Sequence, residues 1–283
     1  MRNNFNKFNY TDFTSHLLAW YDSRSLVLPW RNCNDPYKIY LSEVMLQQTQ
    51  VKTVLPYYKK WVNKYPTVQS VANANQEQIL KQWEGLGYYG RARNFHKSCQ
   101  IIAMQFDGDI PALPEEFSKL PGVGPYISAA VMSIAFHHPL PAVDTNAIRV
   151  AARLKMVEFS SPADSRVIHR YLSANIPIKR SGDFNQAIMD LGREICKSDN
   201  PKCTICPVSK FCKALVNNFV DKYPVKIKPN KKPHYNIAVG IIWNRGKILI
   251  SKRRENGLLG GLWEFPGGKI EKGENAQTCI VRE

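Results

Sequence analysis

The segment Leu120-Pro121-Gly122-Val123-Gly124-Pro125-Tyr126 joins two short helical patterns. Its two glycines let the backbone approach a phosphate closely, and the amides that begin the second helix suit an anion. The pattern predicts a helix–hairpin–helix, a motif that holds the DNA backbone without reading its sequence. Taken alone, a G-x-G of this kind also fits a tight structural turn.

The spacing of apolar residues predicts consecutive helices from residue 11 to residue 216. We expect them at 11–21, 36–48, 54–65, 76–84, 92–106, 115–120, 126–136, 145–154, 166–175 and 183–196. This region is therefore expected to be mainly α.

Four cysteines lie together after the last of these helices. They have the spacing C-x6-C-x2-C-x5-C: Cys196, Cys203, Cys206, Cys212. Four thiolates in such a pattern can enclose an iron–sulfur cluster or a zinc ion, and the spacing alone leaves both open. A metal centre there would brace a loop that carries several lysines.

The composition indicates a polyanionic partner. The 283 residues carry 39 Lys and Arg against 23 Asp and Glu, a net charge of +16. Such a basic protein is expected to lie along nucleic acid. No apolar run approaches the ~18 residues of a membrane span, and the start has no secretory leader. We expect a cytoplasmic, nucleoid-associated monomer with reduced cysteines.

The composition changes after Cys212. Residues 217–234 are polar and rich in Lys and Pro, which favours an extended basic linker. Apolar runs at 237–242 and 248–250 flank a turn at 244–247, which indicates a β-hairpin. The sequence therefore predicts a helical domain at 1–216, a linker at 217–234 and a β-containing domain at 235–283.

Taken in order, the hairpin, an aspartate about twenty residues later and the four cysteines resemble the endonuclease III superfamily of DNA glycosylases. Residues 42–51 and 83–93 are similar to adenine DNA glycosylases of the MutY type. The resemblance covers residues 11–216. It implies a six-helix barrel plus an iron–sulfur subdomain, with a [4Fe–4S] cluster on the loop at 196–212. It also implies removal of adenine opposite 8-oxoguanine or guanine in double-stranded DNA.

Glu43 and Asp144 match the two catalytic carboxylates of that family. Adenine leaves readily only when a ring nitrogen is protonated, and the remaining sugar has oxocarbenium character. One carboxylic acid and one carboxylate can divide this work, as in glycoside hydrolysis. Apolar neighbours are expected to raise the pKa of Glu43, and a helix N-terminus to keep Asp144 ionised. Outside this motif, a helical Glu is usually a solvated surface residue and such an Asp an N-cap.

Tyr126 distinguishes between two reactions. Enzymes of the endonuclease III type that also cleave the strand carry a lysine at this point, which forms a Schiff base. The tyrosine resembles the adenine glycosylases, so we expect base removal without an efficient lyase step. A core aromatic is the alternative role of its ring.

Further residues match functional positions of the family. The pocket for the flipped adenine is matched by Trp30, Arg31, Leu46 and Gln186. A wedge that contacts the opposite strand is matched by Gln48, Thr49 and Tyr88. Base flipping needs both a pocket and a filler for the vacated stack. Asn146 matches a residue that positions Asp144, and Gly122 and Gly124 match the hairpin that holds DNA. For each of these, core packing or a surface role is the alternative.

The last part of the sequence looks like the beginning of a Nudix box. Residues 258–268 lead into the pattern Gly268-x5-Glu274-x7-Arg282-Glu283. The metal-holding glutamates of nucleoside-diphosphate hydrolases come later in such a box, so we expect this chain to lack pyrophosphatase activity. In adenine glycosylases a Nudix-like domain helps to recognise 8-oxoguanine. Three alternatives stay open: an endonuclease III-like glycosylase with lyase activity, a DNA-binding module without catalysis, and a Nudix hydrolase in a longer form.

Overall fold

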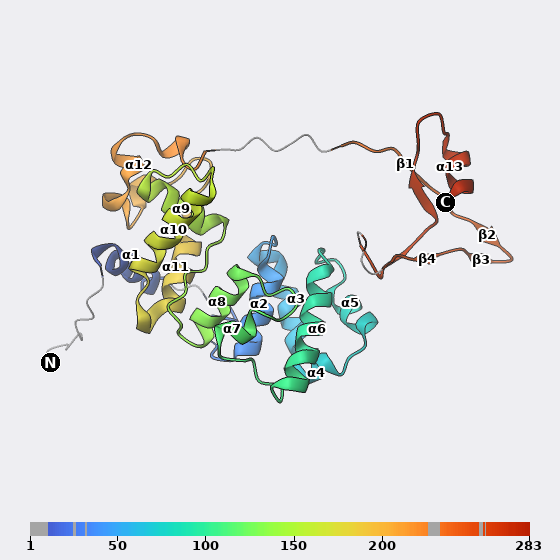
Figure 1. Ribbon diagram of the computed structural model, residues 1–283, viewed down its shortest axis with the longest axis horizontal. Coiled ribbons are helices and arrows are strands. Elements are labelled where there is room, and N and C mark those ends of the chain that lie inside the picture. Colours follow the sequence, from blue (N-terminus) through green and yellow to red (C-terminus); the bar gives the residue numbers. More distant parts are fainter. Residues whose placement is uncertain (1–10, 25–26, 32, 226–232, 255–256, 258) are drawn as a thin grey trace. The chain divides into compact units, whose positions relative to one another are not determined.

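The computed structural model describes residues 11–24, 27–31, 33–225, 233–254, 257 and 259–283. These residues divide into two compact units (Figure 1). The first contains the described residues of 11–87 and 91–225, and the second contains those of 233–283 together with Tyr88–Gly90. Residues 226–232 of the expected linker lie outside the described residues.

The first unit is built from helices, which confirms the mainly α class predicted for it. Its α-helices are α1 (Asp12–Asp22), α2 (Pro36–Leu46), α3 (Val51–Lys64), α4 (Val68–Ala72), α5 (Gln76–Trp83), α6 (Gly90–Gln105), α7 (Pro114–Phe117), α8 (Pro125–Ala135), α9 (Thr145–Lys155), α10 (Pro162–Asn175), α11 (Ser181–Glu194) and α12 (Lys213–Val216). Four 3-10 turns join them: η1 (Ile178–Arg180), η2 (Cys203–Ile205), η3 (Ser209–Phe211) and η4 (Val220–Lys222). Within the described chain, no helix is both long and apolar enough to span a bilayer.

Capping residues set several helix ends that the apolar pattern placed a few residues away. α10 begins at Pro162 instead of residue 166 because the side chains of Ser161 and Asp164 form a capping box. The pattern missed α4, a five-residue helix whose start is fixed by a capping box between Thr67 and Ser70. Helices this short contain too little periodic sequence to be detected from spacing alone.

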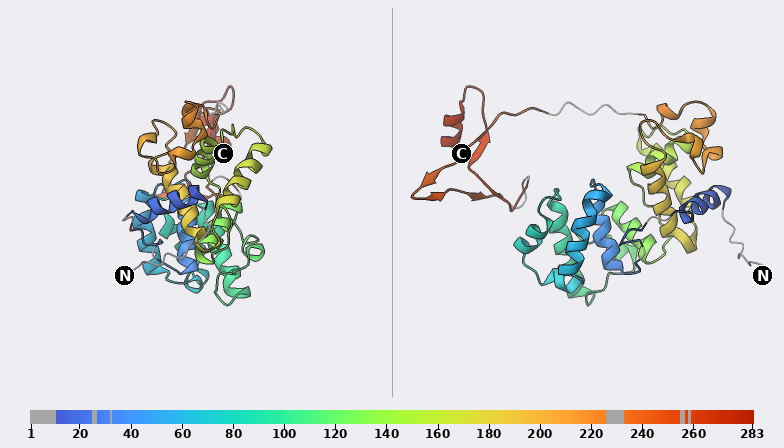
Figure 2. Two further views of the ribbon diagram at one scale, coloured as in Figure 1. Left: turned by 90° about the vertical axis from the view of Figure 1, so that its left-hand side faces the viewer. Right: turned by 180° about the vertical axis from the view of Figure 1, so that it is seen from behind.

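The helices gather into two groups within the first unit. Figure 1 shows α2, α3, α5, α6 and α8 lying together, and α1, α9, α10, α11 and α12 lying together, and Figure 2 shows the same grouping. Aromatic rings fill the first group, where Trp61 contacts Trp83 and Phe95 at centroid distances of 5.5 and 5.9 Å. In the second group, Phe13, Leu17 and Phe184 belong to one continuous core. Helix α11 packs on both α8 and α9, so it joins the two groups.

The second unit contains short strands and one helix. The strands are β1 (Ile237–Val239), β2 (Trp243–Asn244), β3 (Lys247–Ile248), β4 (Ser251–Lys252), β5 (Trp263–Glu264) and β6 (Gly267–Lys269), and the helix is α13 (Ala276–Arg282). The expected hairpin forms only between β2 and β3, over two residue pairs. The prediction that its first strand includes residues 237–239 is wrong, because β1 pairs antiparallel with β6.

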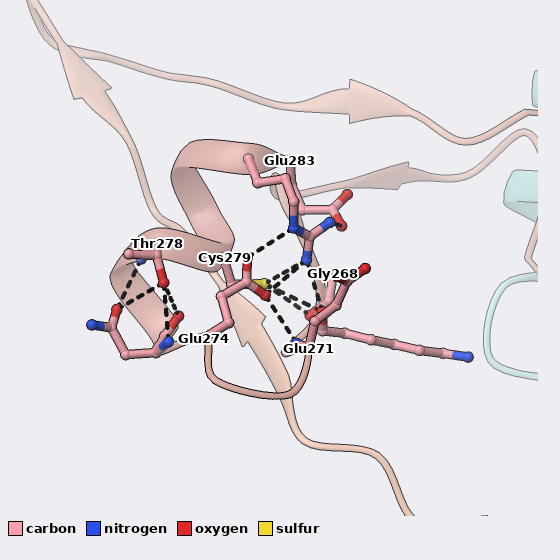
Figure 3. A network of polar contacts seen from close by, with 9 residues as sticks. Gly268, Glu271, Glu274, Thr278, Cys279 and Glu283 are labelled. Carbon is pink, nitrogen blue, oxygen red and sulfur yellow. Dashed lines mark hydrogen bonds and ion pairs between the residues drawn. The ribbon is translucent and has the colours of Figure 1, made fainter.

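The Nudix-like residues form a compact polar network around α13 (Figure 3). The Arg282 guanidinium donates 2.8 and 3.0 Å hydrogen bonds to the Glu274 carboxylate. These bonds hold the pKa of Glu274 at about 2. Arg282 also donates to the Lys269 carbonyl at 2.9 Å, which ties the helix to the end of β6.

Candidate active site

Glu43 is a buried acid on a helix whose other side chains are almost all core residues. It is 5% exposed. The Tyr126 hydroxyl donates a 2.8 Å hydrogen bond to its Oε2, while its Oε1 has no partner within the described residues. Burial raises the pKa of Glu43 to about 7, and the negative charge of Asp144 acts in the same direction. The Tyr126 hydrogen bond and the positive charge of Arg31 lower it. This carboxyl group can therefore keep its proton near neutral pH.

Asp144 caps α9 and lies close enough to influence Glu43. Its Oδ1 accepts a 2.7 Å hydrogen bond from the amide of Ala147, and its Oδ2 accepts a 2.8 Å bond from the side chain of Asn146. The amides at the start of α9 favour the ionised form of Asp144, as expected, but burial outweighs them. Burial raises the pKa of Asp144, and these hydrogen bonds only reduce that shift. Its carboxyl group is therefore better satisfied than that of Glu43 but still desolvated.

Asn146 is held by Arg149 of its own helix α9, and Arg149 also binds the neighbouring helix α11. The Arg149 guanidinium donates 2.8 Å and 2.7 Å bonds to the Asn146 side-chain oxygen and to the Gly192 carbonyl. At Gly192 an added Cβ would lie 2.6 Å from the Cβ of Asn146. A residue without a side chain is needed there for α11 to approach α9 so closely. The sequence gives no local signal for this contact, because the two residues lie on different helices.

Tyr126 lies at the start of α8, directly after the glycine-rich turn. Its ring is half-buried, and its hydroxyl also lies 3.2 Å from the Met189 sulfur. Burial, together with the negative charges of Glu43 and Asp144, raises its pKa well above the ordinary value. The phenol therefore stays protonated and donates its hydrogen to Glu43.

Most of the residues matched to the adenine pocket contact residues that the sequence did not indicate. The Arg31 guanidinium binds the Asp190 carboxylate through both nitrogens, one at 2.8 Å. Gln186 accepts a 3.1 Å hydrogen bond from the Tyr21 hydroxyl, which leaves its amide nitrogen unpartnered within the described residues. Trp30 is buried, and the centroid of its ring lies 5.0 Å from that of Tyr58. Leu46 is half-buried at the end of α2.

The residues matched to the wedge follow α2 and α5. Gln48 and Tyr88 adopt left-handed backbone conformations, with φ of 55° and 49°. Such conformations are costly for residues other than glycine and are found disproportionately at functional sites. Both side chains are exposed, Tyr88 to 60%.

Arg91 joins the segment that ends α2 to the segment that follows α5 at Gly87, a role that the sequence did not indicate. Its guanidinium donates to the carbonyls of Met45 and Gln47 at 2.7 and 2.6 Å, and to that of Gly87 at 3.2 Å. It also lies 3.2 Å from the hydroxyl oxygen of Thr49. One side chain therefore satisfies the carbonyl end of α2 and brings both segments together.

The glycine-rich turn forms between α7 and α8. Gly122 has a φ of +78°, and an added Cβ there would lie 2.7 Å from the Cβ of Asn94 on α6. Gly124 is the N-cap of α8 and is exposed. The hydroxyl of Ser98 donates a 2.8 Å bond to the carbonyl of Pro121, so α6 supports the turn from behind.

The four cysteines occupy the loop after α11, and all are half-buried with free thiols. Burial raises the pKa of Cys206 to about 11, and the other three thiols contribute to this rise. The thiols are therefore neighbours. Among the described residues, however, no three His, Cys, Asp or Glu side chains are close enough together to hold a metal ion. Arg153 on α9 holds the loop, donating to the carbonyl of Lys197 at 2.6 Å and lying 3.4 Å from the sulfur of Cys196.

Comparison with known proteins agrees with this arrangement. The family of HhH-GPD superfamily base excision DNA repair proteins matches residues 41–172, and the NUDIX domain family matches 238–283. Adenine DNA glycosylase of Buchnera aphidicola is 36% identical over 258 residues, which cover 90% of this chain and 73% of the relative. The Arabidopsis thaliana protein of the same name is 35% identical, over 93% of this chain and 48% of its own length.

Solved structures are similar over the helical unit. A thermostable thymine-DNA glycosylase superimposes with a TM-score of 0.65 at 28% identity, covering 72% of this chain and 95% of that protein. A trapped endonuclease III–DNA covalent intermediate gives a TM-score of 0.61 at 25% identity, covering 72% and 94%. From its fold and from its relatives, this chain belongs to the adenine DNA glycosylases of the helix–hairpin–helix superfamily of base excision repair proteins.

Proposed function

We propose that this glycosylase removes adenine paired with 8-oxoguanine or guanine in double-stranded DNA, with Glu43 as the general acid. The observation that carries the proposal is the buried Glu43 carboxyl. One of its oxygens is held by Tyr126, the other has no protein partner among the described residues, and its pKa is about 7. A carboxylic acid in this state can donate a proton to a ring nitrogen of adenine at neutral pH.

Asp144 supplies the negative charge in the proposed reaction. Proton transfer from Glu43 turns adenine into a better leaving group, so the bond between its nitrogen and the sugar breaks. The positive charge that develops on the sugar is stabilised by the Asp144 carboxylate, which Asn146 and the Ala147 amide hold in place. Water then adds to the sugar carbon and returns a proton to Glu43.

Tyr126 supports base removal without strand cleavage. A strand-cleaving glycosylase needs an amine at this point to form a Schiff base with the sugar. The phenol has no such reactivity and is engaged with Glu43. Borohydride treatment during reaction is expected to trap no abundant protein–DNA adduct. Strong trapping would identify a lyase instead.

The cysteine loop is proposed to hold a [4Fe–4S] cluster. Its four half-buried free thiols provide the required donor set, one thiolate for each iron. A cluster bound there would brace the loop and keep Lys197 and Lys202 near DNA phosphates. Iron and sulfide analysis, with visible absorption, tests this proposal. Stoichiometric zinc without sulfide would contradict it.

The activity is tested with a duplex containing adenine opposite 8-oxoguanine, treated with protein and then with alkali. We expect strand cleavage at the adenine only after alkali, and we expect Glu43→Gln to abolish it. The exposed Glu158 offers a matched control, because Glu158→Gln makes the same change outside the site. Undiminished excision by Glu43→Gln would exclude the acid role. Binding of the duplex without excision by the unsubstituted protein would indicate a DNA-binding module.

A further inference from the structure

A buried carboxylate lies at the centre of a group of arginines beside the active site. The side chain of Asp190, on α11, is only 1% exposed. Its Oδ2 is 2.9 Å from Arg24, and its Oδ1 is 2.8 Å from both Arg31 and Arg193. A second nitrogen of Arg31 also binds Oδ2. The buried negative charge is therefore fully compensated, as a desolvated carboxylate requires.

Arg31 differs from the other two arginines in the way it binds Asp190. It binds both carboxylate oxygens, and this bidentate geometry fixes the plane of a guanidinium as well as its position. Its carbon Cζ also lies 5.7 Å from the centre of the Tyr21 ring. Burial lowers the pKa of Arg31, but the hydrogen bonds and charge of Asp190 raise it overall, so Arg31 remains a cation.

This fixed cation acts on the proposed acid. Three groups of the described chain influence the ionisation of Glu43: Arg31 in the segment before α2, Tyr126 on α8 and Asp144 at the start of α9. Of these, only Arg31 carries a positive charge, and it favours the ionised form of Glu43. No charged group of α3, which packs on α2, adds to these influences. Asp190 of α11 is not among the groups that act directly on Glu43, but it contacts Arg31.

We propose that Asp190 is a positioning residue that fixes Arg31 and offsets its positive charge, so that Glu43 keeps the proton it must donate to adenine. Without the negative charge at Asp190, the field of Arg31 at Glu43 would be uncompensated, and the acid would ionise more readily. This inference rests on the proposed role of Glu43. It assigns to Asp190 an effect on the reaction without contact between Asp190 and the adenine.

The pH dependence of excision separates this role from a purely structural one. Because Glu43 must be protonated to act, the single-turnover rate is expected to fall as pH rises through about 7. Asp190→Asn leaves Arg31 uncompensated and is expected to move this alkaline limb to lower pH by about one unit. Arg31→Gln removes the cation and is expected to move the limb to higher pH. A structural role alone would lower the rate at every pH without opposite shifts.

Three further measurements complete the test. Arg24→Gln removes a partner of Asp190 that does not contact Arg31, so it is expected to leave the limb in place. Asp190→Glu keeps the negative charge and is expected to leave the alkaline limb closer to its position in the unsubstituted protein than Asp190→Asn does. Thermal unfolding of each variant identifies misfolded protein. If Asp190→Asn does not fold, Arg31→Gln and Asp190→Glu still decide: an unmoved limb in the first, or a limb moved to lower pH in the second, overturns the inference.

Failure of this inference differs from failure of the proposed function. An excision rate that does not fall at alkaline pH, or an active Glu43→Gln variant, would contradict the proposed role of Glu43 as the general acid. A normal limb that Asp190→Asn and Arg31→Gln leave unmoved, or move in the same direction, would overturn only the role of Asp190.

Discussion

At the scale of single residues, the proton on Glu43 makes stability depend on pH. Burial raises its pKa from 4.5 to about 7, so the folded protein resists ionisation of this group. Stability is therefore greater below the unfolded pKa and is lost as pH rises through the folded one. Each unit of pKa difference between the folded and unfolded states corresponds to about 1.4 kcal/mol, so the free energy of unfolding is lower by about 3 kcal/mol above pH 7.

The corresponding prediction is that Glu43→Gln stabilises the protein at alkaline pH while abolishing excision. Thermal unfolding followed at about pH 5 and pH 8 should show a smaller alkaline loss of Tm for Glu43→Gln than for the unsubstituted protein. Parallel losses in the two proteins would show that Glu43 is ionised in the fold at little cost. Comparing the two proteins isolates Glu43 from Asp144, whose pKa is also raised.

Gly192 supports a second prediction at this scale. Gly192→Ala would place its Cβ 2.6 Å from the Cβ of Asn146 and displace the residue that holds Asp144. A shift of about 1 Å in a catalytic group can lower the rate about 100-fold, so we expect kcat to fall by that order. Single-turnover kinetics at saturating protein measure this effect. Gly257→Ala, whose Cβ would lie 3.4 Å from the nearest atom, is the matched control.

At the scale of elements, the carbonyl end of α2 depends on one side chain. Arg91 satisfies the carbonyls of Met45 and Gln47 and connects them to Gly87.

Arg91→Lys keeps the positive charge but loses the planar set of guanidinium donors. We expect weaker binding of the mispaired duplex, measured as Kd in the Glu43→Gln background, and a stability loss of about 1–3 kcal/mol. The exposed Arg170, changed to Lys, controls for the substitution itself. Equal effects at both positions would contradict the role of Arg91.

Some helices and strands could be predicted from the sequence, and others could not. Apolar spacing and caps located the long helices α1, α3 and α9 to within a few residues, because local interactions set their ends. The short α4 was not predicted because five residues contain too little periodic sequence, and the pairing of β1 with β6 was not predicted because it joins segments distant in sequence. In the same way, motifs located Glu43, Tyr126 and Asp144. Tyr21, Arg91, Asp190 and Gly192 emerged only from packing between helices.

At the scale of the whole molecule, α9 connects the reaction centre to the cysteine loop. Its N-cap is Asp144, and near its other end Arg153 holds the carbonyls of Lys197 and Ser198 at 2.6 and 3.1 Å. Removal of the proposed cluster with a chelator and reductant is expected to lower Tm and weaken DNA binding, because the loop loses its brace.

In this experiment we expect kcat at saturating duplex to fall less than affinity, since Glu43 and Asp144 lie on other segments. Cys203→Ser should reproduce the effect, and Cys33→Ser, which changes a thiol outside the loop, should not. An unchanged Tm after iron removal would exclude a structural role for the metal centre.

The contact between Gly192 and Asn146 has a genetic consequence. Every non-synonymous single-base change in a glycine codon either ends the chain or introduces a residue with a Cβ. No single base substitution can therefore replace Gly192 and still leave room for Asn146. A gene encoding this repair enzyme is thus intolerant of base substitution at the first two positions of this codon, which are both guanine. Guanine is also the base whose oxidised form the enzyme is proposed to recognise opposite adenine.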